Sequence, residues 1–423
     1  MKSLKKPTVD IGPGASSRFV DYIGRLDRRS IRIVADSNTW AAAGERVASA
    51  AKAAGIEVAA TIYGEEQLVA DARSVLKLLI EEEDGKRLFV AVGSGTITDI
   101  VRFVAQRTGR DFVSVPTAPS VDAYGSVVAP LVVDRVKRTV GASAPAAIFA
   151  DTDILSRAPR PMIAAGFGDM LCKFSAVADW RLGALLWGES YDEEIARRAL
   201  AAASSCVEAV ESIGRARPEG LAVLMAALVE SGLCMADAGN SRPASGAEHQ
   251  YSHFWEMRLL REGRPPVLHG LKVGVGTLVA AGLWERLRSL SREDAARALA
   301  SCPPRSPEEE RGIIRAVFGG EAAEIEAGQE RFLSMTAEAR RELGARILGD
   351  WERIRDIARG VPDAAETARL LAAARCPADP RELGLGDEEI DLALRHAHYL
   401  RDRFTARKLS LMLFGDAAPS SRP

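Results

Sequence analysis

The fold is decided by the stretch Leu88-Phe89-Val90-Ala91-Val92-Gly93-Ser94-Gly95-Thr96-Ile97-Thr98-Asp99. Its apolar first half predicts a buried strand, and a helical pattern at residues 100–105 follows the glycines. Glycines between a strand and a helix let the backbone approach a pyrophosphate, and the helix N-terminus supplies free N–H groups. The stretch therefore predicts either a dinucleotide-binding turn, with Thr96 as a further donor, or an ordinary tight turn in which Thr98 or Asp99 caps the helix.

On both sides of this turn, short β-branched runs alternate with helical patterns, as is typical of a doubly wound parallel sheet. Beyond Asp153 the strand signals stop, and helical periodicity continues to about residue 413. Strands are expected at residues 31–34, 57–63, 88–92, 112–115 and 147–150, helices at residues 40–54 and 69–82, and a two-stranded excursion at residues 126–133 and 136–140.

The domain organisation follows from this change of pattern. We predict an α/β N-terminal domain with a Rossmann-like parallel sheet, followed by an all-α C-terminal domain. The Pro-rich break near residues 157–161 sets the boundary, so that residues 1–158 form the dinucleotide-binding domain and residues 159–414 the helical metal- and substrate-binding domain. The composition of residues 415–423 predicts a flexible tail. A chain of 423 residues is long enough for two cores.

Composition and charge narrow the class of protein. The formal net charge is -2 and charged residues make up 27%, which gives no signature of nucleic-acid binding. The longest apolar run, residues 221–228, is far below the roughly 20 residues that cross a bilayer, so we expect a buried helix and no membrane insertion. No apolar stretch follows the basic N-terminus, and the 5 cysteines form no close pair. These features predict a cytoplasmic protein.

Asp36 ends the first predicted strand in Val34-Ala35-Asp36-Ser37-Asn38. A carboxylate at this place suits the ribose diol of a dinucleotide and repels a 2′-phosphate. The alternative is that Asp36 caps the next helix.

The histidines are the first clue to chemistry, because three of the 5 fall within residues 249–269. His249 and His253 are one helical turn apart and share a face. His269 follows the Pro265-Pro266 break. Imidazole is the commonest ligand of transition metals, but core or surface roles remain the alternative. The other two, His396 and His398, are expected to be helix-surface or interface residues.

A catalytic divalent metal site usually adds a third protein ligand, and a carboxylate is the natural partner of two imidazoles. Asp169, in Gly166-Phe167-Gly168-Asp169-Met170, is the candidate. We expect it at a helix start, where the glycines leave room for close approach. The alternative is an N-terminal aspartate paired with Lys173.

Four blocks in this order resemble the iron-containing alcohol dehydrogenase superfamily, and within it the bacterial glycerol-1-phosphate dehydrogenases. They are residues 93–99, 114–122 (Ser-Val-Pro-Thr-Ala-Pro-Ser-Val-Asp), 164–170, and 246–253 with His269-Gly270. Two departures are Ser94, where many members have a third glycine, and Leu271, where a polar residue often follows His-Gly. Neither departure touches a candidate ligand.

The resemblance implies a role for each matching residue. Asp169, His249 and His269 would bind one divalent metal ion, which could be zinc, nickel or iron. Asp122 and His253 would face the substrate, with Asp169 beside it and His253 relaying a proton. The resemblance implies an NAD(P)-dependent enzyme that interconverts dihydroxyacetone phosphate and sn-glycerol 1-phosphate, and a homodimer is the default for its assembly. Residues implied to line the cofactor are Gly93, Ser94, Gly95, Thr96, Ile97, Thr117, Ala118, Pro119, Ser120 and Ser126.

Three other functions are weighed against this one. A glycerol or other polyol dehydrogenase of the same superfamily would prefer an unphosphorylated substrate. A cyclase similar to dehydroquinate synthase would have a glutamate in place of Asp169 and a Gly-Gly-Lys-Thr stretch, and this sequence has neither. A catalytically idle nucleotide-binding protein would not need the three candidate ligands. The basic residues that would bind a substrate phosphate stay open among Lys137, Arg138, Lys173, Arg242 and Lys272.

Overall fold

The computed structural model describes residues 6–26, 28–65, 67–82, 87–133 and 136–415. The chain divides into two compact units. The sheet unit comprises residues 1–170 and 201–239, and the helical unit comprises residues 171–200 and 240–423. The division predicted from sequence, at residues 1–158, 159–414 and 415–423, stays a prediction. Of the predicted tail at residues 415–423, only Gly415 belongs to the described residues.

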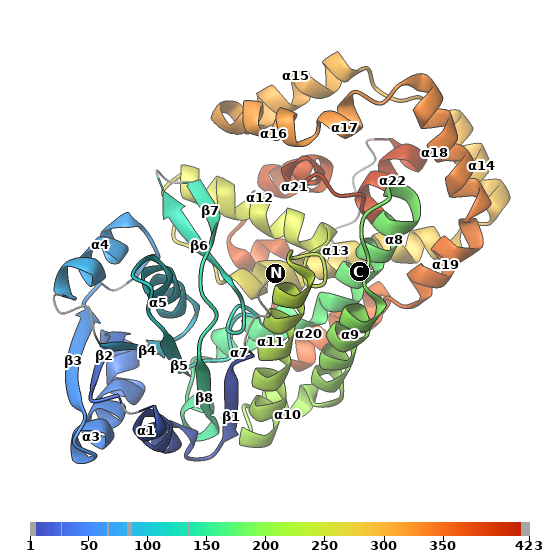
Figure 1. Ribbon diagram of the computed structural model, residues 1–423. Helices are drawn as coiled ribbons and strands as arrows, with labels where there is room; N and C mark the ends of the chain where they lie inside the picture. Colours follow the sequence, from blue (N-terminus) through green and yellow to red (C-terminus); the bar gives the residue numbers. More distant parts are fainter. Residues whose placement is uncertain (1–5, 27, 66, 83–86, 134–135, 416–423) are drawn as a thin grey trace. The chain divides into compact units, whose positions relative to one another are not determined.

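The sheet unit is built on a parallel sheet with the strand order β1-β8-β5-β4-β2-β3, which can be followed in Figure 1. This arrangement confirms the predicted parallel sheet. The predicted excursion is confirmed as an antiparallel pair of strands. The strands are β1 (Thr8–Gly12), β2 (Ser30–Asp36), β3 (Glu57–Tyr63), β4 (Leu88–Gly93), β5 (Phe112–Pro116), β6 (Val128–Val133), β7 (Val136–Gly141) and β8 (Ala147–Asp151).

Helices cover both faces of this sheet, and alternate residues of β4 are buried in two different clusters. Val90 and Val92 pack in one cluster with α1 and α3, while Phe89 and Ala91 pack in the other with α4 and α5. Burial on both faces explains why β4 is apolar throughout. The helical segments of the sheet unit are α1 (Ala15–Arg25), α2 (Ser37–Thr39), the π-helix η1 (Trp40–Gly44), α3 (Glu45–Ala53), α4 (Ala72–Glu81), α5 (Gly95–Arg107), α6 (Thr152–Leu155), α7 (Arg160–Leu171), α10 (Val210–Gly214) and α11 (Pro218–Ala238).

Two local predictions need correction. The helix predicted at residues 69–82 begins only at Ala72, because Asp71 caps it and also pairs with Val132 of β6. The side chain of Asp71 accepts a hydrogen bond of 2.9 Å from the Ser74 N–H. Strand β1 was not predicted at all, although it forms the edge of the sheet beside β8. Its short length and half-exposed pattern make a weak signal.

Helix α11 contains the apolar run at residues 221–228 that was expected to be a buried helix. Among the described residues it is the one helix long and apolar enough to cross a membrane by length and composition. A core helix passes the same test, and α11 packs tightly against the loop after β5. A Cβ atom added at Gly232 would lie 2.8 Å from the backbone nitrogen of Gly125. The residues of the run that face inward, such as Leu221 and Leu228, are fully buried.

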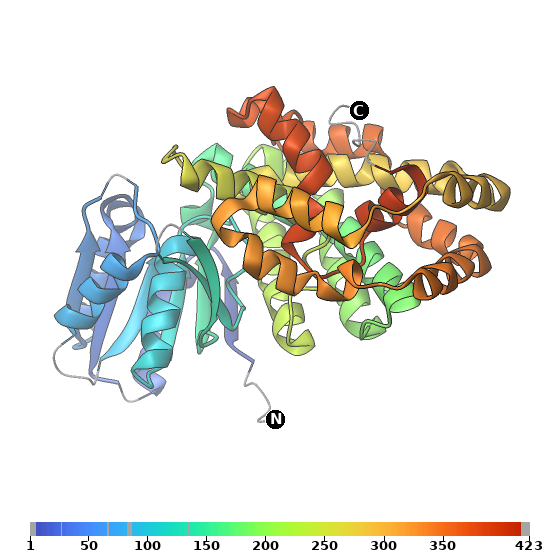
Figure 2. The ribbon, with the colours of Figure 1, turned by 90° about the horizontal axis from the view of Figure 1, so that it is seen from above.

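The described part of the helical unit contains helices and connecting segments only, as Figure 2 shows for the chain from yellow to red. Its central helix, α13, contributes Val275 and Val279 to one buried cluster and Trp284 and Leu287 to another. Helix α9 (Glu193–Glu208) contains the boundary between the two units at residue 200. The other helices are α8 (Lys173–Trp187), α12 (Ala247–Arg261), α13 (His269–Ser289), α14 (Arg292–Ser301), α15 (Pro307–Phe318), η2 (Gly319–Glu321), α16 (Ala322–Gly328), α17 (Glu330–Leu333), α18 (Ala337–Gly349), α19 (Trp351–Arg359), α20 (Ala364–Ala373), η3 (Pro380–Leu383), α21 (Asp387–His396), η4 (Ala397–Leu400) and α22 (Ala406–Phe414).

Helix α7 approaches the loop after β5 so closely that one glycine has no room for a side chain. A Cβ atom on Gly166 would lie 1.9 Å from the carbonyl oxygen of Pro119.

We expect Gly166→Ala to lower the free energy of unfolding by about 1–3 kcal/mol or more, because the backbone of α7 or of the loop must move to make room. The matched control is Gly282→Ala in α13, where a Cβ atom would meet nothing within 4 Å. This second change should stabilise the protein by about 0.5–1 kcal/mol. Urea denaturation measures both, and a Gly166→Ala variant as stable as the wild type would contradict the contact.

Candidate active site

The turn after β4 places an uncapped helix N-terminus at the end of the strand. Ser94 is the N-cap residue of α5, and its side chain makes no capping hydrogen bond. Thr98 and Asp99 lie inside the helix, so the alternative in which one of them caps it is wrong. Gly93 is required because a Cβ atom there would lie 2.7 Å from the side chain of Ile97. The first N–H groups of α5 are therefore available to an anion such as a pyrophosphate.

The loop after β5 begins beside this turn. Strands β4 and β5 end in register, with Gly93 opposite Pro116. The Thr117 N–H then donates a hydrogen bond of 3.2 Å to the carbonyl oxygen of Gly93. Residues 117–120 are buried, and the Tyr124 hydroxyl donates to the carbonyl oxygen of Ala118 at 2.5 Å. The structure thus brings together the two segments that were expected to bind the cofactor.

Arg102, which sequence reasoning missed, holds the next part of this loop. Its guanidinium is fully buried and donates hydrogen bonds to the carbonyl oxygens of Ala123, Tyr124 and Val128 at 2.5, 3.1 and 2.9 Å. Asp99, one helical turn earlier, lies 3.7 Å from the guanidinium. Burial raises the pKa of Asp99 to about 7 and lowers that of Arg102. The Asp99–Arg102 spacing of three residues was the available signal.

Asp122 and Asp169 are connected by a hydrogen bond inside the sheet unit. The Asp122 N–H donates to Oδ2 of Asp169 at 3.0 Å, and the Ser231 hydroxyl donates to Oδ2 of Asp122 at 2.9 Å. Asp169 is fully buried and lies in the last turn of α7, so its predicted position at a helix start is wrong. The helix begins earlier, at Arg160-Pro161, because proline is well suited to a first turn.

The three clustered histidines come together in the helical unit. His249 and His253 project from α12, and His269 is the first residue of α13. The ring centroids of His249 and His269 lie 5.3 Å apart, and that of His253 lies 5.8 Å from each. His249 is buried, while His253 and His269 are half-buried. The clustering that the sequence suggested therefore exists in space.

Glu248 fixes the ring of His249. Its buried carboxylate lies 3.0 Å from Nδ1 of His249 and accepts hydrogen bonds from the Ser175 hydroxyl at 2.8 Å and from the Gly246 N–H at 2.5 Å. Burial alone would raise the pKa of Glu248, but hydrogen bonds from His249 and from the Gly246 N–H hold it below its usual value. An ionised carboxylate accepts only, so Nδ1 donates the proton, and in the neutral imidazole Nε2 then keeps its lone pair. Sequence reasoning assigned no role to Glu248.

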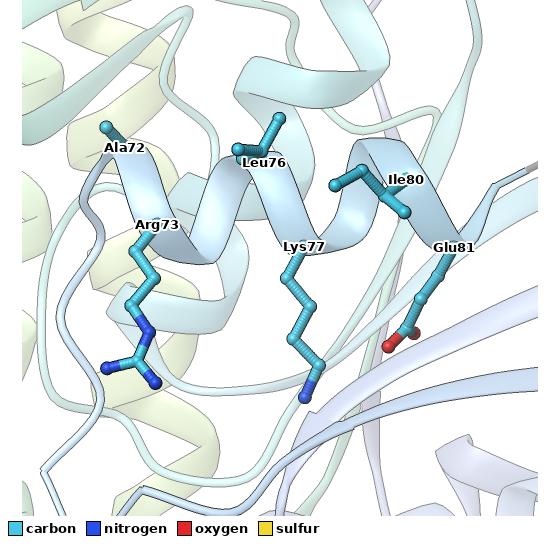
Figure 3. Close-up of a pocket in the computed structure, with 6 residues that line it drawn as sticks. All are labelled: Ala72, Arg73, Leu76, Lys77, Ile80 and Glu81. Atoms are coloured by element: carbon cyan, nitrogen blue, oxygen red, sulfur yellow. The ribbon is translucent and has the colours of Figure 1, made fainter.

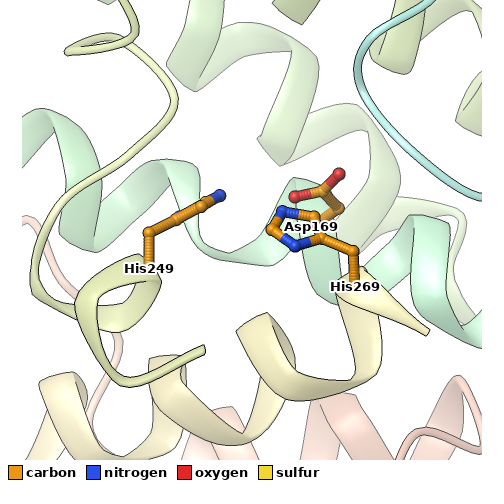
Figure 4. Close-up of side chains that lie close together, drawn as sticks. All are labelled: Asp169, His249 and His269. Atoms are coloured by element: carbon orange, nitrogen blue, oxygen red, sulfur yellow. The ribbon is translucent and has the colours of Figure 1, made fainter. Parts of the chain in front are cut away.

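The three candidate ligands, drawn in Figure 4, come from both units: Asp169 from α7 of the sheet unit, and His249 and His269 from α12 and α13 of the helical unit. One carboxylate and two imidazoles are a donor set that suits zinc and related divalent ions. In the helical unit, the ligand atoms of Cys172, Glu248 and His249 lie within 4.8 Å of one another, but all three residues are buried. Glu248 already accepts three hydrogen bonds, so it is better suited to orient His249 than to bind an ion itself.

Other predicted residues have structural roles that sequence could not settle. The side chain of Asp36 caps α2 by accepting a hydrogen bond of 2.8 Å from the Thr39 N–H, so the capping alternative is confirmed, and its contact with a ribose stays a prediction. Ser126 accepts a hydrogen bond of 3.2 Å from the Val128 N–H through its hydroxyl. The expectation that His398 is a surface or interface residue is wrong, because it is 2% exposed, while His396 is half-buried. Burial lowers the pKa of both imidazoles.

Three of the five basic residues considered for a substrate phosphate are buried against the protein itself. The Lys173 ammonium lies 3.4 Å from the carbonyl oxygen of Ala244, and Lys272 donates to that of Val267 at 2.7 Å. Arg242 forms an ion pair with Glu189. Lys137 and Arg138 belong to β7.

Comparison with known proteins first defines the class. Residues 10–159 match the family model of iron-containing alcohol dehydrogenases. Solved structures with the same fold include a glycerol dehydrogenase from Schizosaccharomyces pombe, with 19% identity, a TM-score of 0.64, and coverage of 98% of this chain and 89% of that chain. A probable glycerol dehydrogenase from Sinorhizobium meliloti 1021 has 17% identity, a TM-score of 0.62, and coverage of 98% of both chains. At these identities the likeness shows the fold alone.

Curated relatives of higher identity then define the family. A protein from Bacillus velezensis named glycerol-1-phosphate dehydrogenase (NAD(P)+) is 35% identical over 93% of this chain and 88% of its own length. One of the same name from Bacillus subtilis (strain 168) is 34% identical over 96% of this chain and 91% of its own length. The chain therefore belongs to the glycerol-1-phosphate dehydrogenase family of iron-containing alcohol dehydrogenases. The predicted fold and the prediction of an oxidoreductase that acts on a small molecule are confirmed.

Proposed function

We propose that this chain is a glycerol-1-phosphate dehydrogenase that reversibly reduces dihydroxyacetone phosphate to sn-glycerol 1-phosphate with NADH or NADPH and one divalent metal ion. The observation that carries the proposal is the pair of imidazoles of His249 and His269, whose ring centroids lie 5.3 Å apart and to which Asp169 would add a carboxylate. The names and identities of the Bacillus relatives support the choice of substrate.

The metal ion would be held by the Asp169 carboxylate and the two imidazoles. When bound, such an ion supplies Lewis acidity that favours negative charge on a substrate oxygen, and NAD(P)H supplies the hydride. Glu248 would keep the proton of His249 on Nδ1, so that Nε2 faces the ion as a neutral ligand. Zinc, nickel and iron all suit these donors.

His253 and Asp122 would act on the substrate side. His253 lies on the same face of α12 as His249 and is half-buried, so its imidazole can exchange protons with solvent. We expect it to donate a proton to the oxygen of the reduced carbonyl, directly or through water. Asp122, whose carboxylate accepts from Ser231, would orient a substrate hydroxyl.

The dinucleotide would lie at the turn after β4. Its pyrophosphate would accept from the uncapped first turn of α5, and residues 117–120 with Ser126 would line the nicotinamide half. Asp36, at the end of β2, would contact the adenosine ribose.

The choice of substrate is tested by comparing oxidation of sn-glycerol 1-phosphate and of glycerol by the metal-loaded enzyme. We expect kcat/KM for glycerol 1-phosphate to be higher by at least about a hundredfold, because a phosphate adds charge-assisted hydrogen bonds worth roughly 3 kcal/mol or more. The measurement is initial rate with NAD+ and with NADP+ at several concentrations of each alcohol. A preference for glycerol would overturn the proposal and favour a polyol dehydrogenase of the same fold.

The metal site is tested by a change outside the proposed ligands. We expect Glu248→Gln to weaken metal affinity by about 10- to 100-fold, because an amide no longer fixes the His249 tautomer. The apoprotein is titrated with Zn²⁺ against a chromophoric chelator, which reports binding without any assay of activity. The control is Glu262→Gln at the exposed end of α12, which should bind as the wild type does. If His269→Ala also binds Zn²⁺ normally, the proposed ligand set is wrong.

We also propose that the protein is a cytoplasmic homodimer. All 5 cysteines are free thiols, which agrees with a reducing compartment. For the dimer, the relevant surface is the outer face of α4, drawn in Figure 3, where Leu76 and Ile80 are 56% and 65% exposed. Two large apolar side chains this exposed on one helix indicate a surface that another protein covers.

The spacing on α4 suits a second copy of the same helix. In an antiparallel pair with two-fold symmetry about Leu76, Ala72 of one copy meets Ile80 of the other. Lys77 would lie near the axis, but its ammonium is turned toward its own strand β3. It donates to the carbonyl oxygen of Ile62 at 3.0 Å. The row Ala72, Leu76 and Ile80 is therefore complementary to itself in apolar contact.

We expect the double change Leu76→Asp with Ile80→Asp to convert the dimer to monomers, because two carboxylates would meet at the axis and two more would be buried against Ala72 of the facing copies. Size-exclusion chromatography with light scattering gives the mass of each form. The control is Leu26→Asp, at a residue 42% exposed on another element, which should leave the dimer intact. A monomeric wild type, or a dimer that survives the double change, would exclude this interface.

A further inference from the structure

The helical unit contains a cavity of about 690 Å³, which is lined by residues between positions 296 and 415 and by none of the proposed metal ligands. Its walls come from α14, α15, α17, α18 and α22. Leu299, Phe332 and Leu348 are among the apolar residues that line it. Its size falls within the roughly 300–1,000 Å³ that is typical of sites for small ligands. Since all lining residues belong to the helical unit, the cavity is defined without reference to the sheet unit.

Three arginines, Arg305, Arg340 and Arg341, also line this cavity, and Arg340 is the informative one. It is half-buried, and burial lowers the pKa of its guanidinium. With the residues that the structure describes, the guanidinium makes no hydrogen bond and no ion pair. A cation removed from water without a partner is costly, which favours an anion beside it.

Glu310, the acidic residue that lines the cavity, does not serve as the anion beside the Arg340 guanidinium. Glu310 acts on Arg340 electrostatically, but its carboxylate already accepts a hydrogen bond from the hydroxyl of Tyr399. Arg341 is exposed on the same helix, α18, one residue further on. The cavity thus combines apolar walls with an excess of positive charge.

From this combination we propose that the cavity binds an amphipathic anion, that is, a molecule with an apolar chain and a phosphate or carboxylate head. The chain would pack against Leu299, Phe332 and Leu348, and the head would accept charge-assisted hydrogen bonds from Arg340. The site is separate from the proposed metal ligands, so it does not rest on the proposed function.

The test uses decyl phosphate below its critical micelle concentration as the probe, with the full-length protein and isothermal titration calorimetry. We expect binding with one site per chain, and a Kd raised about tenfold or more in Arg340→Ala, since one charge-assisted hydrogen bond is lost. The matched control is Arg346→Ala, an exposed arginine of α18 that does not line the cavity. Its Kd should equal that of the wild type.

Three further ligands separate the contributions of the apolar chain and the charged head. Decanol and inorganic phosphate should each bind far more weakly than decyl phosphate, and decanoate should bind with a Kd that responds to Arg340→Ala in the same way. No binding of decyl phosphate, equal effects of Arg340→Ala and Arg346→Ala, or equal binding of decanol would each overturn the proposal. A second variant, Leu348→Asp, should abolish binding of decyl phosphate. An unchanged thermal midpoint of the Arg340→Ala protein shows that its loss of affinity does not come from unfolding.

Discussion

The hydrogen bond from the Asp122 N–H to the carboxylate of Asp169 is the interaction on which the candidate site depends most. It connects the loop after β5 to the end of α7, and both groups are buried. An ionised carboxylate in such a place needs donors, and a backbone N–H can supply one only if the loop has a single conformation. Arg102 supplies that conformation by bonding three carbonyl oxygens of the loop. Gly166 lets α7 come close enough for the bond to form.

In the helical unit, buried carboxylates also fix the backbone at the start of α12. Asp179 accepts hydrogen bonds from the Ala247 N–H at 2.7 Å and from the Ala406 N–H at 2.6 Å, so it fixes both α12 and α22. Glu248 then fixes the ring of His249 within the first turn. The histidine cluster is therefore positioned by buried carboxylates that do not belong to the proposed ligand set. Such supporting groups usually matter nearly as much as the ligands.

Sequence reasoning succeeded where one local pattern determines the outcome. The β-branched runs located β2, β3, β4, β5 and β8, and the histidine spacing anticipated the cluster that forms between α12 and α13. It failed where long-range contacts decide. Strand β1 exists because β8 offers it an edge, and His398 is buried because of the helices packed around it. The place of Asp169 could have been found locally, since Arg160-Pro161 is a recognisable helix start.

Two buried carboxylates at one helix start would normally repel each other, and the pKa of Asp179 reflects this. Burial, and after it the charge of Glu248, raise that pKa to about 7, while hydrogen bonds hold the pKa of Glu248 low. The N-terminal end of a helix favours negative charge, so α12 stabilises the ionised Glu248. The ionised form is the one that accepts the Nδ1 proton of His249. The buried charge at Glu248 is unfavourable by itself. It keeps the His249 proton on Nδ1, so that the lone pair of Nε2 can bind a metal ion.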